Sequence, residues 1–265
     1  MSPSPVLADR ARRTRLLRPR GDATVRLVVL DLDDTLFLER DYVRSGFLEV
    51  GNLVRRELGW SRFFKAAWTR FVEGRRDMIF DRALEAVGVS PNPEFIRTLL
   101  ECYRTHLPRV QLCPDARRFL SRPPGGVALG VVTDGRPGPQ ALKVRALGVD
   151  RFVDAVECTG QWGPRFAKPH PRAFRLMERR FGLEGSACMY VGDNPARDFQ
   201  GPIGLGWSVS RIRRPGGMFE SADSPGVPSR PGATRTILGP RPRLHSSPRS
   251  LHGRWISCTG NPRTT

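Results

Sequence analysis

Three continuous apolar runs are the clearest pattern along the chain, and each of them ends at a polar residue. They are Val25 to Leu30, Val127 to Val132 and Cys188 to Val191. Strands that are apolar on both faces are typical of a parallel sheet covered by helices on both sides. Phe152 to Val156 and Trp207 to Ile212 are weaker candidates for strands. The pattern therefore predicts a parallel sheet of about five strands.

Segments with the helical spacing of apolar residues lie between these strands. They are Pro114 to Ser121, Pro139 to Leu147 and Pro169 to Phe181. Repeated alternation of strand and helix is the order of elements in doubly wound proteins. We therefore expect an α/β fold with a doubly wound, Rossmann-like parallel sheet.

The first two strands are separated by nearly a hundred residues, far more than the short loops of an α/β unit. Within this stretch three segments have helical spacing, with a break at 88–93: Tyr42 to Leu58, Arg62 to Val87 and Pro93 to His106. We interpret the insertion as a small helical cap domain. Its aromatic residues are expected to form its core: Phe63, Phe64, Trp68, Phe71 and Phe80.

These boundaries divide the chain into four parts. Residues 23–39 and 109–215 form the expected catalytic core, and residues 40–108 form the expected cap. Residues 1–22 are basic, and residues 216–265 are rich in Pro, Arg and Ser with few periodic apolar positions. Such compositions cannot bury enough apolar surface to offset chain entropy, so both ends are predicted to be disordered.

The charge of the chain changes this picture only at its ends. The net charge is +18 over 265 residues, and residues 211–265 alone hold ten Arg and two acidic residues. A basic tail attracts polyanions of any kind, and polyanion binding through the tail is one alternative function. Because no aromatic-interleaved basic stripe or zinc-finger spacing accompanies it, we expect no specific nucleic-acid partner.

The cysteines and the hydropathy of the chain indicate in which cellular compartment we expect the protein. The five cysteines are scattered and show no paired C-x-x-C spacing, which favours reduced thiols. No apolar stretch approaches the ~18 residues that span a bilayer, and the first 22 residues contain no apolar signal-peptide core. We therefore expect a cytoplasmic protein without a membrane partner, whose oligomeric state the sequence leaves open.

The segment Asp31-Leu32-Asp33-Asp34-Thr35 directly follows the first strand. The carboxyl ends of parallel strands meet at one crevice, where ligands bind in open α/β folds. Residues two apart in an extended segment project to the same side, so Asp31 and Asp33 can both face the crevice. One of these carboxylates can attack a substrate while the other handles a proton.

A second acidic pair, Asp193 and Asp198, follows the Cys188 to Val191 strand. Several carboxylates in one crevice repel one another unless a cation neutralises them. Oxygen ligands that leave room for water and substrate phosphate suit Mg²⁺. The sequence therefore predicts Mg²⁺ as the cofactor.

In these features the chain resembles the haloacid dehalogenase-like superfamily, in its phosphatase branch, over about residues 25–215. The resemblance rests on four motifs in the family's order: Asp31 to Thr35, Thr133, Lys168, and Gly192-Asp193 through Asp198. It implies that Asp31 attacks phosphorus to give an aspartyl-phosphate and that Asp33 acts as general acid and then general base.

The resemblance also implies the remaining roles. Mg²⁺ would be held by Asp31, the backbone carbonyl of Asp33 and Asp193, and Asp198 would position its waters or a ligand. Thr133 and Lys168 would bind the phosphoryl group.

Asp134 and Gly135 are expected next to the substrate as well. Asp134 departs from the family's pattern, because many relatives carry Asn after the motif Thr. We expect Asp134 to turn away from the phosphate or to bond locally to backbone. Gly135 would allow close approach of the backbone to the substrate.

The implied function is Mg²⁺-dependent hydrolysis of a small phosphorylated metabolite, with the cap closing over it. A phosphomutase or phosphotransferase of the same superfamily is an alternative, in which the phosphoryl group passes to a hydroxyl instead of water. Dehalogenation is disfavoured, because cleavage of a carbon–halogen bond needs no leaving-group acid such as Asp33.

Overall fold

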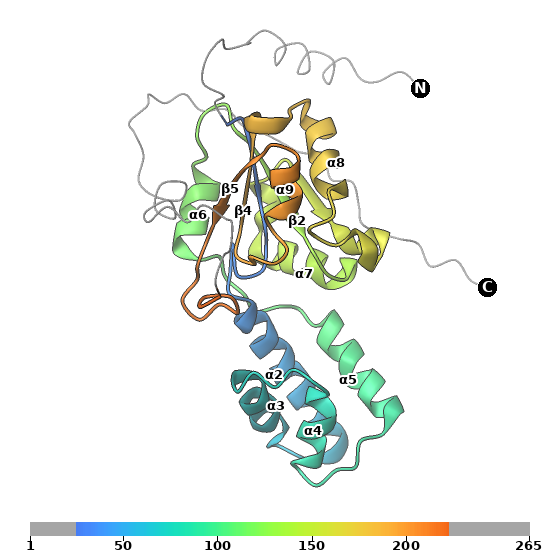
Figure 1. Cartoon of the computed structure of the whole chain (residues 1–265). Helices are drawn as coiled ribbons and strands as arrows, with labels where there is room; N and C mark the ends of the chain where they lie inside the picture. The colour runs from blue at the N-terminus through green and yellow to red at the C-terminus, as the bar shows by residue number, and fades with distance from the viewer. Residues whose placement is uncertain (1–24, 223–265) are drawn as a thin grey trace, which may run out of the picture.

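The computed structural model describes residues 25–222, so the expected disordered segment 1–22 and most of the expected tail lie outside it. Five parallel strands form one sheet in the order β3-β2-β1-β4-β5 (Figure 1). The strands are β1 (Leu27–Leu30), β2 (Ala128–Thr133), β3 (Ala155–Cys158), β4 (Cys188–Gly192) and β5 (Ser208–Arg211). The predicted fold class is confirmed.

Helices cover both faces of the sheet because alternate residues of each strand point to opposite sides. In β1, Val28 and Leu30 belong to the cluster that includes α6 (Pro114–Ser121) and α7 (Pro137–Leu147). Its neighbours Leu27 and Val29 pack on the other face in the cluster that includes α8. On that face lie α8 (Arg172–Phe181) and α9 (Gln200–Gly204). The strands are therefore buried on both sides, as their continuous apolarity predicts.

The inserted residues form a helical layer below the carboxyl edge of the sheet in the view of Figure 1. It consists of α2 (Glu39–Leu58), α3 (Phe63–Val72), α4 (Ile79–Glu85) and α5 (Pro93–Thr105). Aromatic rings form its core, with Phe47 making edge contacts to Phe71 and Phe80 at centroid distances of 6.0 and 5.5 Å. None of the helices within residues 25–222 is long and apolar enough to cross a membrane.

The expectation of one helical segment from Arg62 to Val87 is wrong. The segment is divided into α3 and α4 by a turn in which Gly74 has φ +77° and Met78 has φ +43°. These left-handed conformations end a helix, and glycine adopts them without steric cost. The turn lets the two helices pack against each other within the cap.

Two further boundaries differ from the prediction. The third strand begins at Ala155 instead of Phe152, because Val149–Arg151 forms a short 3-10 helix (η1). The Asp154 carboxylate then accepts a hydrogen bond from the Leu129 amide at 3.0 Å and starts the pairing with β2. The helix expected from Pro169 begins only at Arg172, after 3-10 turns at Thr159–Trp162 (η2) and Pro164–Phe166 (η3). A fourth 3-10 turn, η4, covers Gly185–Ala187.

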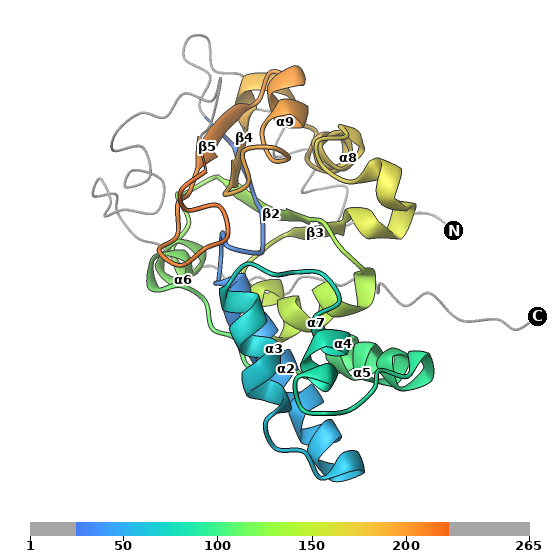
Figure 2. The same ribbon diagram turned by 60° about the horizontal axis from the view of Figure 1, so that its bottom comes forward.

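After β5 the described chain continues past the expected core boundary at 215 and folds back onto the first motif. The Met218 amide donates to Asp34 Oδ2 at 2.8 Å. The Arg211 guanidinium donates to the carbonyls of Phe219 and Ala222, both at 2.7 Å. In Figure 2 this segment, drawn in orange, runs from β5 toward the start of α2. Residues 216–222 therefore lie beside the first motif at the carboxyl edge of the sheet.

Candidate active site

The strand ends bring the predicted site residues to one pocket. β1 is flanked by β2 and β4, with Leu30 paired to Val131 and Val191. Asp31 therefore lies between Thr133, the last residue of β2, and Asp193, which follows β4. The pocket has a volume of about 440 Å³, and its lining includes the predicted residues Asp31, Asp33, Thr133, Asp134, Gly135, Lys168 and Asp193. Asp198 is not in the lining.

Lys168 is a buried cation below Asp31. Its Nζ donates to Asp31 Oδ1, to Asp198 Oδ1 at 2.7 Å and to the Tyr190 hydroxyl at 3.0 Å. All three ammonium donors are thereby used. Burial alone would lower the pKa of Lys168, but the Asp198 and Asp31 carboxylates raise it well above its usual value. The lysine therefore keeps its positive charge beside the expected nucleophile.

Asp198 holds Lys168 from beneath the pocket. Its side chain is fully buried, and its second oxygen accepts from the Asn194 amide at 2.8 Å. The close approach depends on Gly192, where a Cβ would lie 2.2 Å from Asp198 Oδ2. The structure thus places Asp198 behind Lys168 and outside the pocket lining.

Asp33 is anchored by two side chains that the sequence did not single out. Lys143 Nζ donates to Asp33 Oδ1 at 2.7 Å, and Gln140 Nε2 donates to Asp33 Oδ2 at 2.8 Å. Gln140 Nε2 also lies 2.6 Å from Thr133 Oγ1. Their spacing, three residues apart on α7, places both on one helix face. The sequence does not show which face of α7 lies against the sheet edge, so it could not identify these two residues.

Asp134 lines the pocket, and the hydrogen bonds of its carboxylate are not local. Its Oδ1 accepts from the Lys168 amide at 3.0 Å and from Thr159 Oγ1 at 2.6 Å. The alternative of a bond to nearby backbone is therefore wrong, because these partners belong to the loops that follow β3. Arg197 approaches Oδ2 at 3.5 Å. Asp134 thus fixes the backbone of the loop that carries Lys168.

The carboxylates at the pocket floor carry more negative charge than Lys168 balances. Burial, and secondly the Asp198 and Asp34 carboxylates, raises the pKa of Asp193 to about 8. Burial, followed by the nearby carboxylates and against the attraction of Lys168, raises the pKa of Asp31 well above its usual value. A divalent cation would favour the ionised forms of both groups.

The available donors fit Mg²⁺ only if backbone and water oxygens complete the set. In the part of the chain that the structure describes, no group of three or more His, Cys, Asp or Glu side chains is arranged to hold an ion unaided. Mg²⁺ commonly takes one or two carboxylates and keeps several waters and substrate oxygens. Asp31 and Asp193 with a backbone carbonyl match that requirement.

The cap supplies part of the pocket wall, which the sequence did not predict residue by residue. Glu39 and Tyr42 of α2, with Tyr103 and Arg104 of α5, line the pocket opposite the sheet edge. The Glu39 amide donates to Asp34 Oδ1 at 2.8 Å, which ties the start of the cap to the first motif. Docking of the insertion onto the core brings these residues together, and no local pattern encodes that docking.

Comparison with known proteins agrees with this geometry. The model of the haloacid dehalogenase-like hydrolase family matches residues 25–206. A phosphoserine phosphatase of Thermus thermophilus is 29% identical over 217 residues, covering 67% of this chain and 84% of the relative. A glyceraldehyde 3-phosphate phosphatase of Pyrococcus abyssi is 26% identical, covering 69% and 79%. An (S)-2-haloacid dehalogenase of Xanthobacter autotrophicus is 25% identical, covering 72% and 76%.

A solved structure has the same fold. It is the putative hydrolase YfnB from Bacillus subtilis bound to magnesium, with a TM-score of 0.50, 18% identity and coverage of 70% of this chain and 86% of the other. The strand order, the helical insertion after β1 and the family match over most of the chain agree with one another. The chain therefore belongs to the haloacid dehalogenase-like hydrolase family.

Proposed function

We propose that the protein is a Mg²⁺-dependent phosphomonoesterase that hydrolyses a small phosphorylated metabolite through an aspartyl-phosphate on Asp31. One observation carries this proposal most directly. Asp31 and Asp33 both line the pocket, with Asp31 held by Lys168 and Asp33 held by Gln140 and Lys143. Two oriented carboxylates with separate partners suit separate roles as nucleophile and proton carrier.

Hydrolysis takes two steps in this proposal. In the first, an oxygen of Asp31 bonds to phosphorus while the bond from phosphorus to the ester oxygen breaks, and Asp33 gives its proton to that oxygen. In the second, the Asp33 carboxylate takes a proton from water, whose oxygen bonds to phosphorus as the bond to Asp31 breaks. Phosphate leaves, and Asp33 is again protonated.

In this proposal Thr133 donates to a phosphoryl oxygen, and Lys168 supplies a positive charge beside the phosphoryl group. The Thr133 hydroxyl points to the Asp134 carbonyl at 3.4 Å, and it is free to rotate toward a substrate oxygen. Lys168 is fixed by Asp198 and Tyr190, so it supplies positive charge without reorganisation. Gly135, at φ +113°, allows the backbone after β2 to approach the phosphoryl group.

Asp31, the backbone carbonyl of Asp33 and Asp193 would hold Mg²⁺, with Asp198 orienting the surrounding groups. Bound Mg²⁺ would offset the charge of the transferring phosphoryl group and of the carboxylates. The magnesium in the solved Bacillus relative supports this assignment.

The pocket favours a small, anionic substrate. Its volume of about 440 Å³ lies in the range for small-molecule sites. Besides Lys143 and Lys168, three arginines line it: Arg104, Arg136 and Arg197. The relatives named for phosphoserine and glyceraldehyde 3-phosphate are consistent with a substrate of this size. We infer that the alcohol part of the substrate carries a carboxylate, which Arg104 of the cap would bind.

Dehalogenation is the competing function, because one relative is a haloacid dehalogenase. The anchored Asp33 favours phosphoryl transfer, since departure of a halide requires no proton. Phosphomutase chemistry uses the same residues and differs only in whether water or a hydroxyl accepts the phosphoryl group. Polyanion binding through the tail concerns residues mostly beyond the described range, and nothing within residues 25–222 favours it.

A direct test measures three products from the full chain with Mg²⁺ and with a chelator. Phosphate monoesters should release inorganic phosphate only with Mg²⁺, and Asp31→Asn should abolish release. Halide from 2-haloacids would instead establish dehalogenation, and isomerised sugar phosphate without free phosphate would establish a mutase. Phosphate release by Asp31→Asn at the parent's rate would overturn the proposal.

A further inference from the structure

Lys143 is a buried cation that the four family motifs do not include. It lies on α7, and its side chain is 6% exposed. Its Nζ lies 2.7 Å from Asp33 Oδ1 and 4.2 Å from the centroid of the Tyr42 ring. Asp33 follows β1, whereas Tyr42 belongs to the first cap helix. One ammonium group therefore contacts the catalytic core and the cap at the same time.

The contact with Asp33 fixes the direction of its carboxylate. Lys143 occupies one oxygen and Gln140 Nε2 occupies the other at 2.8 Å. Each carboxylate oxygen has two lone pairs, so both oxygens retain capacity for a proton or a water molecule. An anchored carboxylate has already lost its rotamer freedom, so no further rotamer entropy is lost when it transfers a proton to the leaving oxygen. The anchors thus orient the group without blocking it.

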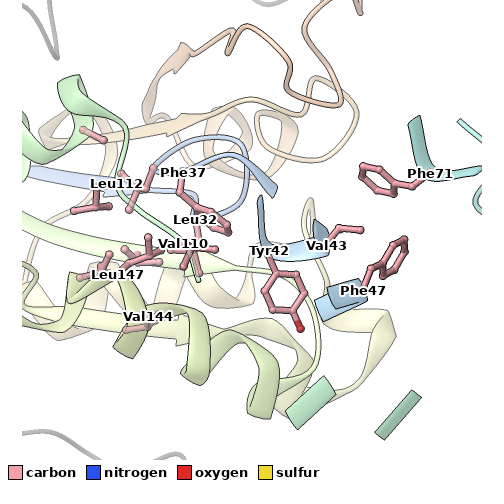
Figure 3. Packing of buried hydrophobic residues seen from close by; sticks show 14 of the residues in the cluster. Leu32, Phe37, Tyr42, Val43, Phe47, Phe71, Val110, Leu112, Val144 and Leu147 are labelled. Carbon is pink, nitrogen blue, oxygen red and sulfur yellow. The ribbon is translucent and has the colours of Figure 1, made fainter. Parts of the chain in front are cut away.

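The Tyr42 ring that contacts Lys143 is held in position by its own neighbours. Tyr42 is 5% exposed, and its ring makes an edge contact to Tyr103 at 5.5 Å and a tilted contact to His106 at 5.0 Å. His106 is held in turn by Ser45 Oγ at 2.8 Å. In Figure 3 the Tyr42 side chain extends from the blue ribbon of α2, and it belongs to the same buried cluster as Val144 of α7. The cap therefore presents a fixed aromatic face to the lysine.

Stability alone does not account for a lysine at this position. Replacement of a buried ion pair by apolar residues is often neutral or stabilising, so the pairing of the buried Lys143 with the half-buried Asp33 is weak evidence for a structural role. An ammonium ion over an aromatic ring is attracted to its face, which favours one position of Nζ. The geometry instead suits control of where the Asp33 carboxylate points.

We propose that Lys143 is the positioning residue of Asp33 and that the Tyr42 ring holds Lys143 in place, so that docking of the cap sets the acid/base carboxylate. This inference rests on the proposed phosphomonoesterase function. Separation of the cap from the core would withdraw the ring from Lys143 and loosen Asp33. Proton transfer to the leaving group would then be efficient only with the cap docked.

The test uses the leaving-group dependence of kcat/KM, which reports the steps through formation of the aspartyl-phosphate. A series of phosphate monoesters, from p-nitrophenyl phosphate to simple alkyl phosphates, is measured with Mg²⁺ in the full chain. Alkyl leaving groups need the proton from Asp33, whereas p-nitrophenolate leaves without it. Lys143→Met should lower kcat/KM about 10- to 100-fold for alkyl esters and less than about 3-fold for p-nitrophenyl phosphate.

Variants of Tyr42 test the connection to the cap. Tyr42→Leu removes the ring and should steepen the leaving-group dependence in the same direction as Lys143→Met. Tyr42→Phe keeps the aromatic face and should retain the parent's slope. Lys65→Met makes the same chemical change as Lys143→Met at an exposed position of α3, and should leave the whole series unchanged.

The outcomes separate this inference from the proposed function. If the parent releases no phosphate, or if Asp31→Asn remains active, the proposed function fails first. If the parent is active and Lys143→Met lowers kcat/KM equally for all esters, Lys143 binds substrate or supports the fold, and the positioning role is overturned. If Lys143→Met does not fold, the Tyr42→Leu and Tyr42→Phe pair decides, and equal slopes for the two overturn the inference.

Discussion

Asp198 and Lys168 form a buried ion pair at the floor of the pocket, with 2.7 Å between Asp198 Oδ1 and Lys168 Nζ. Because Lys168 also contacts Asp31, Asp198 controls a charge beside the expected nucleophile without reaching the pocket. Lys168 is thus the group beside the substrate, and Asp198 is the group that positions Lys168.

Asp198→Asn should therefore lower kcat while leaving KM nearly unchanged. The amide retains the volume of the carboxylate but cannot accept hydrogen bonds from both Lys168 and the Asn194 amide. We expect a fall in kcat of at least about 10-fold, as one charge-assisted bond of roughly 1.5 to 3 kcal/mol is lost. Steady-state kinetics with a phosphate monoester provide the measurement.

Asp154→Asn is the matched control for this exchange. Its carboxylate also accepts from a backbone amide, that of Leu129, but it lies at the start of β3 and outside the pocket lining. The control should leave kcat within about 2-fold of the parent, because surface and distal exchanges seldom affect the site. Unchanged kcat in Asp198→Asn would contradict the positioning role of Asp198.

The second prediction concerns Gly192, the last residue of β4. A Cβ at this position would lie 2.2 Å from Asp198 Oδ2 and 2.6 Å from its Cγ. Gly192→Ala should displace Asp198, reduce activity, and destabilise the fold by about 1–3 kcal/mol, the usual cost of overpacking. Urea unfolding and kcat are measured on the same preparation.

Gly138→Ala separates steric crowding from the general effect of adding a methyl group. A Cβ at Gly138, near the start of α7, meets no atom within 4 Å. Alanine has the higher helix propensity, so this variant should be as stable as the parent or more stable by up to about 1 kcal/mol. Equal stability of both variants would show that Asp198 can move aside at little cost.

The site residues that the sequence predicted are those whose positions follow directly from the order and pairing of the strands. Asp31, Thr133 and Asp193 stand at or just after the ends of apolar strands, and parallel pairing brings such ends to one edge. Because the strands are short and buried on both faces, their register leaves little freedom. The pattern of apolar and polar positions along the chain is therefore enough to place these three side chains together.

The residues that escaped prediction depend on how elements dock. Gln140 and Lys143 reach Asp33 only because α7 turns one face to the sheet edge. Tyr42 and Arg104 reach the pocket only because the cap folds over it. Helical spacing identifies a face but not its partner, and the break between α3 and α4 depends on the left-handed turn at 73–78. These contacts are determined by packing between segments that are far apart in the sequence.

The third prediction concerns the pH dependence of stability in the chelated, metal-free protein. Burial, and then the nearby Asp33 carboxylate, raises the pKa of Glu39 from its usual 4.5 to about 7. Between these values the folded protein retains a proton that the unfolded chain has lost, so stability falls as the pH rises through this window. Above pH 7 the buried charge is a full cost, at most about 3 kcal/mol.

Glu39→Gln should remove this slope. The variant should match the parent near pH 4.5 and exceed its unfolding free energy by roughly 1 to 3 kcal/mol at pH 8, because a neutral amide has no charge to bury. Urea unfolding at a series of pH values gives the comparison. Glu101→Gln, at an exposed position of α5, should retain the parent's slope. Identical slopes for the parent and Glu39→Gln would show that Glu39 does not titrate in this window.

The last prediction concerns the substrate's anionic group. Arg104 lines the pocket from the cap, and within residues 25–222 no hydrogen bond or ion pair joins its guanidinium to another side chain. An unpaired guanidinium in the pocket lining is suited to a carboxylate on the alcohol part of the substrate. Arg104→Ala should lower kcat/KM about 10- to 100-fold for phosphate esters that carry such a carboxylate, equivalent to a charged hydrogen bond. Esters without the carboxylate should lose less than about 3-fold, since they never used this contact.

Arg97→Ala gives the comparison for this variant, because Arg97 lies on the same helix, is exposed and is absent from the pocket lining. Phosphoserine and phosphoglycolate serve as the carboxylate-bearing esters, and p-nitrophenyl phosphate serves as the ester without a carboxylate. An equal loss for all three esters in Arg104→Ala would mean that Arg104 binds the phosphoryl group itself or supports the cap. An unchanged kcat/KM for all three would place the substrate's carboxylate on Arg136 or Arg197, the other arginines of the lining, or exclude such substrates. A loss of kcat/KM confined to the carboxylate-bearing esters is expected only if Arg104 of the cap binds the carboxylate on the alcohol part.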